Sequence, residues 1–160
     1  MSYGSAQSNA MYSLSVLAKM RGWEFEYYVD HIAGYLQENP HGNYLGAVIN
    51  GMNVIVGRSV PTPTDEVLFI EEGGRQQEAE FGIRLLAEEI IAWQKTEEIE
   101  ALNVFLPSGT GTTALYLQKA LISSVGVGAL RPTVFTTPCV GGAAYLKKQF
   151  LMLEADVSLH

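Results

Sequence analysis

A strand, a turn of small residues and the start of a helix follow one another in Asn103-Val104-Phe105-Leu106-Pro107-Ser108-Gly109-Thr110-Gly111-Thr112-Thr113. The apolar run 103–106 is typical of a buried strand, and a helical pattern begins where the Gly/Thr turn ends. Small residues let backbone amides approach an anion closely, and a helix N-terminus adds free N–H donors and partial positive charge. The turn has neither the lysine of a P-loop nor the glycine spacing of a dinucleotide site. The pattern therefore leaves two interpretations: a phosphate-binding turn, or an ordinary tight turn between a strand and a helix.

Helices and strands alternate outward from this turn in both directions. Apolar residues at helical spacing predict helices at residues 8–21, 43–51, about 79–95, 112–123 and 143–153. Short apolar or alternating runs predict strands at residues 23–29, 53–56, 103–106 and 133–136. Residues 30–41 are expected to form a short helix and a loop. Strands separated by helices of this length predict the α/β class, with a parallel sheet covered by helices on both faces.

Composition narrows the class of protein. The chain has 160 residues, of which 48% are hydrophobic, so we expect one compact domain with a buried core. A net charge of -7, with no basic cluster beyond Lys147-Lys148, argues against nucleic acid and against an anionic membrane surface as partners. No apolar run reaches the roughly 20 residues of a membrane helix, and no signal peptide is recognisable. The single cysteine, Cys139, cannot form an internal disulfide, and we therefore expect a soluble, cytoplasmic protein.

Histidine and cysteine residues give little indication of chemistry. His31 and His41 have no cysteine or acidic residue at metal-ligand spacing, so we expect turn histidines and no metal site. Cys139 has no histidine positioned by the sequence to activate it, which favours a buried structural thiol over a nucleophile.

A second polar segment, Ser5-Ala6-Gln7-Ser8-Asn9, stands at the start of the helix predicted at 8–21. Ser8 suits an N-cap, which is the commoner use of serine at this position. The alternative is that the polar side chains of this turn contact a ligand.

The two turns together resemble the cofactor-contacting loops of the family of 1-aminocyclopropane-1-carboxylate deaminase and D-cysteine desulfhydrase, which are fold-type-II pyridoxal-phosphate enzymes. Other segments resemble the same family: Pro40-His41-Gly42-Asn43-Tyr44, Glu72-Gly73-Gly74-Arg75, Ala79-Glu80-Phe81-Gly82 and Cys139-Val140-Gly141-Gly142. The resemblance covers nearly the whole chain. It implies a partial tryptophan-synthase-β-like architecture, with residues 1–160 as a single α/β domain or a fragment resembling the small domain and part of the large domain.

The resemblance also implies a role for each residue of the two turns. Ser8 would lie over the reacting substrate carbon as a catalytic residue, Asn9 would hydrogen-bond the pyridoxal ring oxygen, and Gln7 would contact the substrate. The phosphate of the cofactor would be held by Gly109, Thr110, Gly111, Thr112 and Thr113. The substrate would be a small amino acid, and the reaction a deamination or a thiol elimination.

The chain departs from the family at the catalytic lysine. The family carries it in a Gly-Asn-Lys segment upstream of the Ser-Asn turn, and the seven residues before Ser8 contain no lysine. That lysine holds the aldehyde covalently and transfers the proton. We therefore expect non-covalent binding of pyridoxal phosphate and little or no turnover by this chain alone.

Two other functions remain open. A partial α/β sheet exposes apolar surface and an unpaired strand edge, which would suit an interaction or assembly subunit, either a homo-oligomer or one part of a split enzyme with a complementing chain. The Gly/Thr turn alone would also suit an independent phosphate- or nucleotide-binding module.

Overall fold

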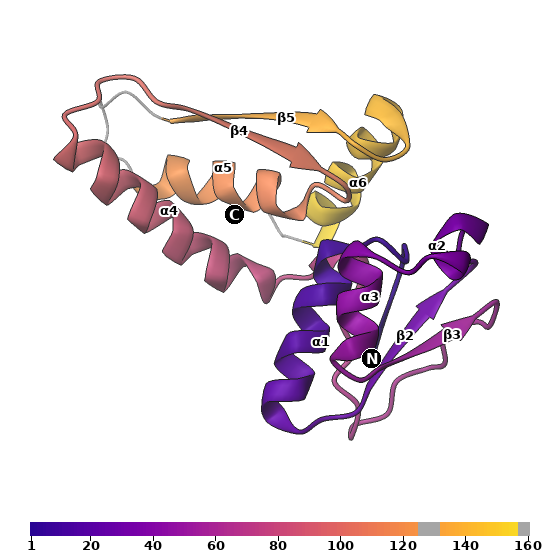
Figure 1. The fold of residues 1–160 in the computed structure, drawn as a ribbon. Helices are drawn as coiled ribbons and strands as arrows, with labels where there is room; N and C mark the ends of the chain where they lie inside the picture. The colour runs from indigo at the N-terminus through magenta and orange to yellow at the C-terminus, as the bar shows by residue number, and fades with distance from the viewer. Residues whose placement is uncertain (125–131, 157–160) are drawn as a thin grey trace. The chain divides into compact units, whose positions relative to one another are not determined.

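Parallel strands flanked by helices make up the protein in the computed structural model, which describes residues 1–124 and 132–156 (Figure 1). The chain divides into two compact units, Met1–Gly74 and Arg75–His160. Each unit has a sheet and a hydrophobic core of its own. The predicted α/β class with parallel strands is confirmed.

The first unit is built on a three-stranded parallel sheet in the order β1-β2-β3. Its strands are β1 (Ser2–Tyr3), β2 (Phe25–Val29) and β3 (Met52–Val56). Its helices are α1 (Asn9–Arg21), α2 (Gly34–Glu38), α3 (Gly42–Ile49) and the 3-10 turn η1 (Glu72–Gly74). Phe25 pairs with Met52 and Val29 with Val56, so β2 and β3 end at the same edge of the sheet.

The alternation of side chains along β2 decides which face of this sheet is buried. Phe25, Tyr27 and Val29 share one face, since successive side chains of a strand point to opposite sides, and all three belong to the hydrophobic core. Figure 1 shows α1 and α3 on this face of the sheet. The two helices pack closely because Gly46 has no side chain: a Cβ there would lie 2.6 Å from the ring of Tyr12.

The segment between β3 and η1 runs back beside β1. Ile70 N donates to Met1 O at 2.9 Å, and a parallel bridge pairs Ser2 with Ile70. The rings of Tyr3 and Phe69 stack with centroids 6.0 Å apart. These contacts hold the proline-containing connector against the sheet, so the β1 edge is partly covered.

The second unit is built on two parallel strands, β4 (Asn103–Ser108) and β5 (Thr133–Pro138). Its helices are α4 (Ala79–Thr96), α5 (Thr112–Ser124) and α6 (Gly142–Asp156). Figure 1 shows α4 and α5 together on one side of the strands. The buried residues of this core are Ala87, Ile91, Leu117, Ala120 and Leu121. Val104, Leu106 and Val134 of the sheet pack against them.

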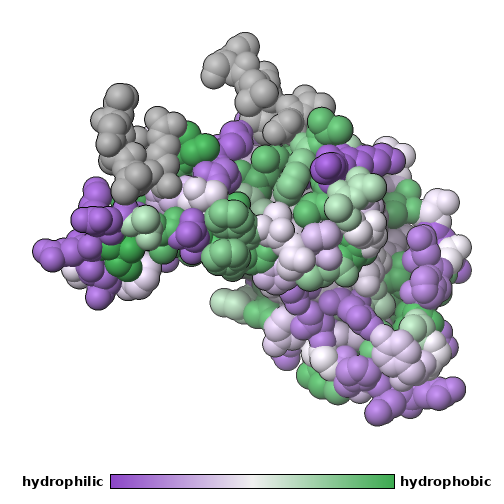
Figure 2. Space-filling model, turned by 90° about the horizontal axis from the view of Figure 1, so that it is seen from above, coloured by the Kyte–Doolittle hydropathy of each residue, from purple (hydrophilic) through white to green (hydrophobic). Residues whose placement is uncertain are grey.

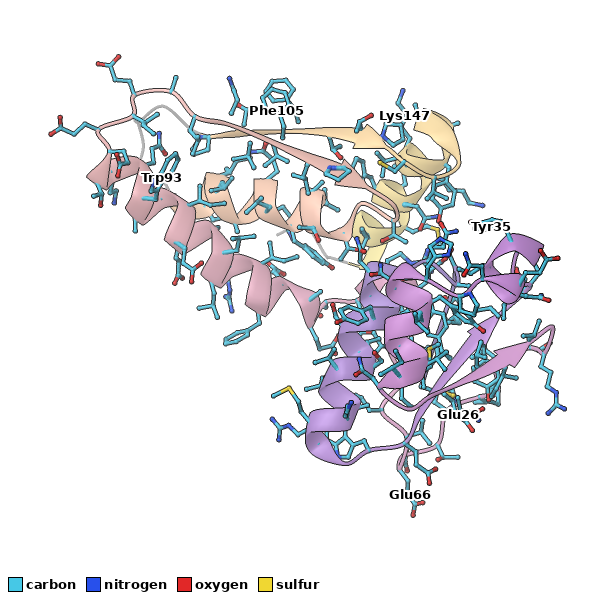
Figure 3. All side chains as sticks on the ribbon, in the orientation of Figure 1. Glu26, Tyr35, Glu66, Trp93, Phe105 and Lys147 are labelled. Atoms are coloured by element: carbon cyan, nitrogen blue, oxygen red, sulfur yellow. The ribbon has the colours of Figure 1, made fainter. Side chains whose placement is uncertain are left out.

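The opposite face of the β4–β5 sheet is exposed. Phe105 is 74% exposed and Phe135 46%, and their rings stack with centroids 5.0 Å apart. The view from above in Figure 2 shows hydrophobic side chains at the surface among hydrophilic ones, and in Figure 3 Phe105 points away from α5. The sequence predicted helices on both faces of the sheet. Within residues 1–124 and 132–156, helices cover only one face of the β4–β5 sheet. An apolar run such as 103–106 is compatible with either arrangement, because periodicity does not distinguish one buried face from two.

The predicted helices and strands lie close to the observed ones. The helix predicted at 8–21 is α1, and it ends at Gly22, whose φ of 66° is the left-handed conformation that glycine favours at a helix C-terminus. The strand predicted at 133–136 is the first part of β5. The two-residue strand β1 was missed, because two residues are too few to show a period.

Candidate functional site

The carboxyl ends of β1, β2 and β3 meet at one edge of the first sheet, which is where open α/β sheets commonly bind ligands. Three segments leave the sheet there: the turn before α1, the residues after β2, and the residues after β3. Between them lies a cleft of about 570 Å³, a size typical of small-molecule sites. Its lining residues are Tyr3, Gly4, Ser5, Ala6, Gln7, Tyr28, Val29, Asp30, His31, Ala33, Leu36, Arg58, Val60 and Glu72.

Charged side chains of both signs line this cleft. Asp30 follows β2 and Arg58 follows β3, and both residues are exposed. Glu72 lies beside the turn that follows β1, since a Cβ on Gly4 would come within 3.0 Å of it. In the part of the chain that the structure describes, neither Asp30 nor Arg58 has an ion-pair partner. The cleft therefore presents one guanidinium group and at least one unpaired carboxylate to solvent.

Tyr27 supports the turn that borders the cleft. Its hydroxyl donates to Ser5 O at 3.2 Å, and a Cβ on Gly4, whose φ is 135°, would lie 2.9 Å from that hydroxyl oxygen. Only glycine fits there. The pKa of Tyr27 is raised to about 12, chiefly by burial, with a smaller opposing contribution from a hydrogen bond with Ser8 and a further raising contribution from the charge of Glu72. The buried phenol therefore stays protonated and holds the turn in place.

Ser8 is the N-cap of α1. Its backbone is extended, with φ -61° and ψ 134°, and its Oγ accepts a hydrogen bond from Met11 N at 3.2 Å. The N-cap interpretation is confirmed. Ser8 does not line the cleft, and a catalytic role for it stays a prediction.

Asn43 of α3 holds both neighbours of Ser8. Its Nδ2 donates to Asn9 Oδ1 at 2.7 Å and to Gln7 O at 3.3 Å. The side chain of Gln7 donates through Nε2 to the hydroxyl of Tyr35, which lies on α2 (Figure 3). Gln7 lines the cleft and Asn9 does not. Gln7 is thus placed to contact a ligand in the cleft, whereas contact of Asn9 with a ring oxygen stays a prediction.

The Gly/Thr turn joins β4 to α5, as predicted. Thr110 Oγ1 and Thr112 Oγ1 lie 3.1 Å apart and share a hydrogen bond. Gly111 has φ 80°, and a Cβ there would clash with the ring of Phe150 and lie 2.7 Å from Leu146. Because both neighbours belong to α6, packing alone requires glycine at position 111.

The other side of this turn is open. A Cβ on Gly109 would have no atom within 4 Å, Gly109 and Thr113 are exposed, and Thr110 is half-buried. Thr112 is buried. Five residues were predicted to cradle a phosphate. Gly109, Thr110 and Thr113 are accessible to a ligand from solvent, whereas Gly111 and Thr112 are buried in the base of the turn.

The base of the turn is tied to the end of β5. Cys139 N donates to Ser108 O at 2.9 Å, and Thr136 Oγ1 donates to Ser108 Oγ at 2.6 Å. The expectation of a buried thiol was wrong, because Cys139 is exposed. It follows the last residue of β5 instead of lying within the strand, so its side chain leaves the core.

The two predicted turns belong to different units, residues 7–9 to the first and residues 109–113 to the second. Each turn is held by contacts within its own unit. Joint use of the two turns by one cofactor stays a prediction.

The sequence pattern did not predict most of the residues that line the cleft. Gln7 was predicted to contact a substrate, whereas Asp30 and Arg58 were not predicted as site residues and His31 was predicted to be a turn residue. The available signal was their position within two residues of the ends of β2 and β3. The order β1-β2-β3, which brings these strand ends together, is a tertiary feature that the pattern does not contain.

The described residues, 1–124 and 132–156, give no indication of a metal site, since no group of three His, Cys, Asp or Glu side chains could hold an ion. In the same residues no helix is both long enough and apolar enough to cross a membrane.

No protein-family model matches the chain, and a search of curated proteins found no significant match.

Proposed function

We propose that this chain is a pyridoxal-phosphate-binding domain of the deaminase or desulfhydrase type, with fold-type-II architecture, from an enzyme that acts on small amino acids. The observation that carries the proposal is the open turn of small residues between β4 and α5. The resemblance of residues 5–9 and 109–113 to the cofactor loops of that family supports it. The α/β architecture with parallel strands is compatible with it.

The residues of the second unit suit the phosphate of the cofactor. Gly109 and Thr113 are exposed at the start of a thirteen-residue helix, and the Thr110 hydroxyl lies beside them. A helix N-terminus carries partial positive charge and free N–H donors, both of which favour a phosphate dianion. Gly111, with a φ of 80°, makes the turn between these residues.

The chain has no lysine at the family's position for covalent attachment of the cofactor. The lysines of the chain are Lys19, Lys95, Lys119, Lys147 and Lys148, and none precedes Ser8. Lys19 Nζ donates to Asn50 Oδ1 at 3.4 Å, and Lys119 Nζ lies 4.0 Å from a Glu80 oxygen. We therefore propose non-covalent binding, with no turnover unless a Schiff-base lysine is supplied from elsewhere.

Bound pyridoxal phosphate supplies an electron sink for bond changes at the α-carbon of an amino acid. The hydrogen bonds within the first turn determine which donor and acceptor groups of its side chains remain available to a ligand. The Asn9 Oδ1 already accepts from Asn43, so the Asn9 amide keeps its N–H groups for a ring oxygen. Ser8 Oγ accepts from Met11 N, and the Ser8 side chain also forms a hydrogen bond with Tyr27, so its hydroxyl is engaged within the turn. In this proposal Asn9 donates to the ligand, and Ser8 contacts it only if the ligand displaces the bond with Tyr27.

The test measures thermal stability of the chain with increasing pyridoxal phosphate, followed by borohydride reduction and peptide mass analysis. We expect stabilisation, by about 2.7 kcal/mol when the ligand is at a hundred times its Kd, and no lysine adduct. Thr110→Glu should abolish the stabilisation, since its carboxylate would face the phosphate. Thr133→Glu places the same charge at the opposite end of the β4–β5 sheet and should leave the stabilisation unchanged.

Unchanged binding by the Thr110→Glu chain would remove the assignment of the turn. A specific adduct on one of the five lysines would show covalent attachment at a new position, contrary to the proposal. Protection by nucleotides but not by pyridoxal phosphate would favour a nucleotide-binding module instead.

A second candidate function is an interaction or assembly subunit, and the exposed stacked pair Phe105–Phe135 is the observation that favours it. Parallel sheets are normally covered on both faces, so a second copy or a complementing chain would be expected to bury this pair. Mass in solution tests this: the wild-type chain would exceed the monomer mass and Phe105→Ser would reduce it. Phe81→Ser, at a phenylalanine on α4 that is 64% exposed, serves as the control. A monomeric wild-type chain would exclude the homo-oligomer.

A further inference from the structure

Asp30 and Arg58 leave neighbouring strands at the same edge of the first sheet. Val29 pairs with Val56, and Gly57 N donates to Val29 O at 2.9 Å, so the pairing of β2 and β3 continues to the point where both strands end. Asp30 follows Val29 directly, and Arg58 follows Gly57. Asp30 is therefore level with Gly57, Arg58 lies one residue further along, and both residues line the same cleft.

The opposite charges of Asp30 and Arg58 are not paired with each other, although the charge of Arg58 acts on the phenol of Tyr28 and opposes the rise of its pKa. Both residues are exposed and line the cleft, and among the residues that the structure describes they form no ion pair with each other or with another residue. Hydrogen bonds between ionised groups are roughly twice as strong as neutral ones. A ligand that carries both charges would form two such bonds at this edge.

The remaining walls of the cleft limit the size and polarity of the ligand. The volume of about 570 Å³ admits a small molecule with room for water. Ala33, Leu36 and Val60 supply apolar wall, and Gln7 supplies an amide. Such walls suit a short apolar side chain beside a polar head group.

We propose that this cleft binds a small α-amino acid through both of its charges, the carboxylate at Arg58 and the ammonium group at Asp30. The ammonium and carboxylate of an α-amino acid are attached to one carbon, so they reach residues on adjacent strands together. The proposal rests on the proposed function only for the choice of amino acids as ligands. Binding itself requires no cofactor, because every residue involved belongs to the first unit.

The charges of the cleft also select against ligands with a single charge. Glu72 lines the cleft in addition to Asp30, so a simple carboxylate would meet two acidic side chains and one guanidinium group. A simple amine would leave Arg58 without a counter-charge. An amino acid satisfies Arg58 and Asp30 and adds no net charge, which distinguishes it from both analogues.

The test titrates the full chain, without pyridoxal phosphate, with D-alanine, L-alanine, propionate and ethylamine, followed by calorimetry or amide chemical shifts. Propionate is alanine without its amine, and ethylamine is alanine without its carboxylate. We expect one alanine enantiomer to bind at least about tenfold more tightly than either analogue, with shifts at residues that line the cleft. Arg58→Gln and Asp30→Asn should each weaken alanine binding by about tenfold or more. The matched controls Arg84→Gln and Asp65→Asn change exposed residues outside the cleft and should have no effect.

The proposal is overturned if neither alanine enantiomer binds saturably, if propionate binds as tightly as alanine, or if Arg58→Gln binds alanine like the wild-type chain. The Thr110→Glu chain separates this result from the cofactor assignment. Alanine binding retained by that chain supports the cleft whatever the outcome with pyridoxal phosphate, and alanine binding lost with Thr110→Glu but kept with Arg58→Gln places the amino acid elsewhere.

Discussion

The β1–α1 turn and the β4–α5 turn are built from the same parts, and they differ in which of their groups remain available to a ligand. Each joins a parallel strand to a thirteen-residue helix through small polar residues. In the first turn the side chains of Ser8 and Asn9 are engaged, by Met11 N and by Asn43. In the second turn Gly111 lies under α6 and Gly109 is open. Similar turn sequences therefore offer different chemistry, because the elements packed against them differ.

The variant that should destabilise the protein most is at Gly111, on the side of the second turn that packs against α6. Gly111→Ala puts a methyl group against Phe150 and Leu146 at a φ of 80°, and should destabilise the second unit by about 3 kcal/mol from overpacking and left-handed strain combined. Gly109→Ala meets no atom within 4 Å and should cost less than about 1 kcal/mol. Urea unfolding measures both variants. Similar losses for the two would show that α6 does not cover one side of the turn.

The next effect concerns the support of the first turn and appears in alkali. The pKa of Tyr27 is 10.0 in its ordinary environment and about 12 in the folded chain, so the unfolded chain loses this proton first. The stability that the neutral phenol contributes is complete below pH 10 and is lost as pH rises towards 12, by up to about 2 to 3 kcal/mol. Unfolding free energy measured from pH 9 to 12 should fall less steeply for Tyr27→Phe. Tyr12→Phe, at an exposed tyrosine of α1, should follow the wild-type curve, and a Tyr27→Phe curve parallel to the wild type would contradict the burial argument.

A smaller effect separates capping from chemistry at Ser8. Ser8→Ala removes the acceptor for Met11 N and should destabilise the chain by about 1 kcal/mol. Ser8→Asp restores an N-cap acceptor and adds a charge that suits the helix N-terminus, so it should recover most of this loss. Thermal unfolding measures both. Equal losses for alanine and aspartate would mean that the hydroxyl stabilises the turn through another contact.

The smallest effect tests the link between the first turn and α3. Asn43→Ala removes the hydrogen bonds to Asn9 Oδ1 and Gln7 O, and should cost about 0.5 to 1 kcal/mol because both acceptors remain accessible to water. The clearer readout is the side-chain amide resonance of Asn9, which should shift towards that of a free amide. Asn53→Ala, at an exposed asparagine of β3, should leave it in place. An unshifted Asn9 resonance in Asn43→Ala would show that the pair is not formed in solution.

The two sheets, like the two turns, have similar sequence patterns but differ in what packs against them. In the first unit the connector before η1 returns along β1 and places Phe69 against Tyr3. In the second unit no described element covers Phe105 and Phe135. Both sheets came from similar alternations of strand and helix, and the sequence pattern predicted the same coverage for both.

Helical periodicity, strand runs and the residues at helix ends were sufficient to locate nearly all the helices and strands. Ser8 and Gly22 mark the start and end of α1 in the sequence, and the structure confirms both. Candidate site residues were harder to predict. Gln7 was found because it stands in a recognisable turn, whereas Asp30 and Arg58 belong to a site only through the pairing of β2 with β3.

The α/β class, the order of the elements other than β1 and η1, and the position of the Gly/Thr turn could be predicted from the sequence, and Ser8 could be recognised as a suitable N-cap, because each depends on residues that are neighbours along the chain. The sequence pattern did not predict the division into two sheets, the exposure of Phe105, the enclosure of Gly111 by α6 or the cleft lined by Asp30 and Arg58. These features depend on packing between residues that are far apart in sequence, and the local pattern of apolar and polar residues is the same whichever surfaces meet.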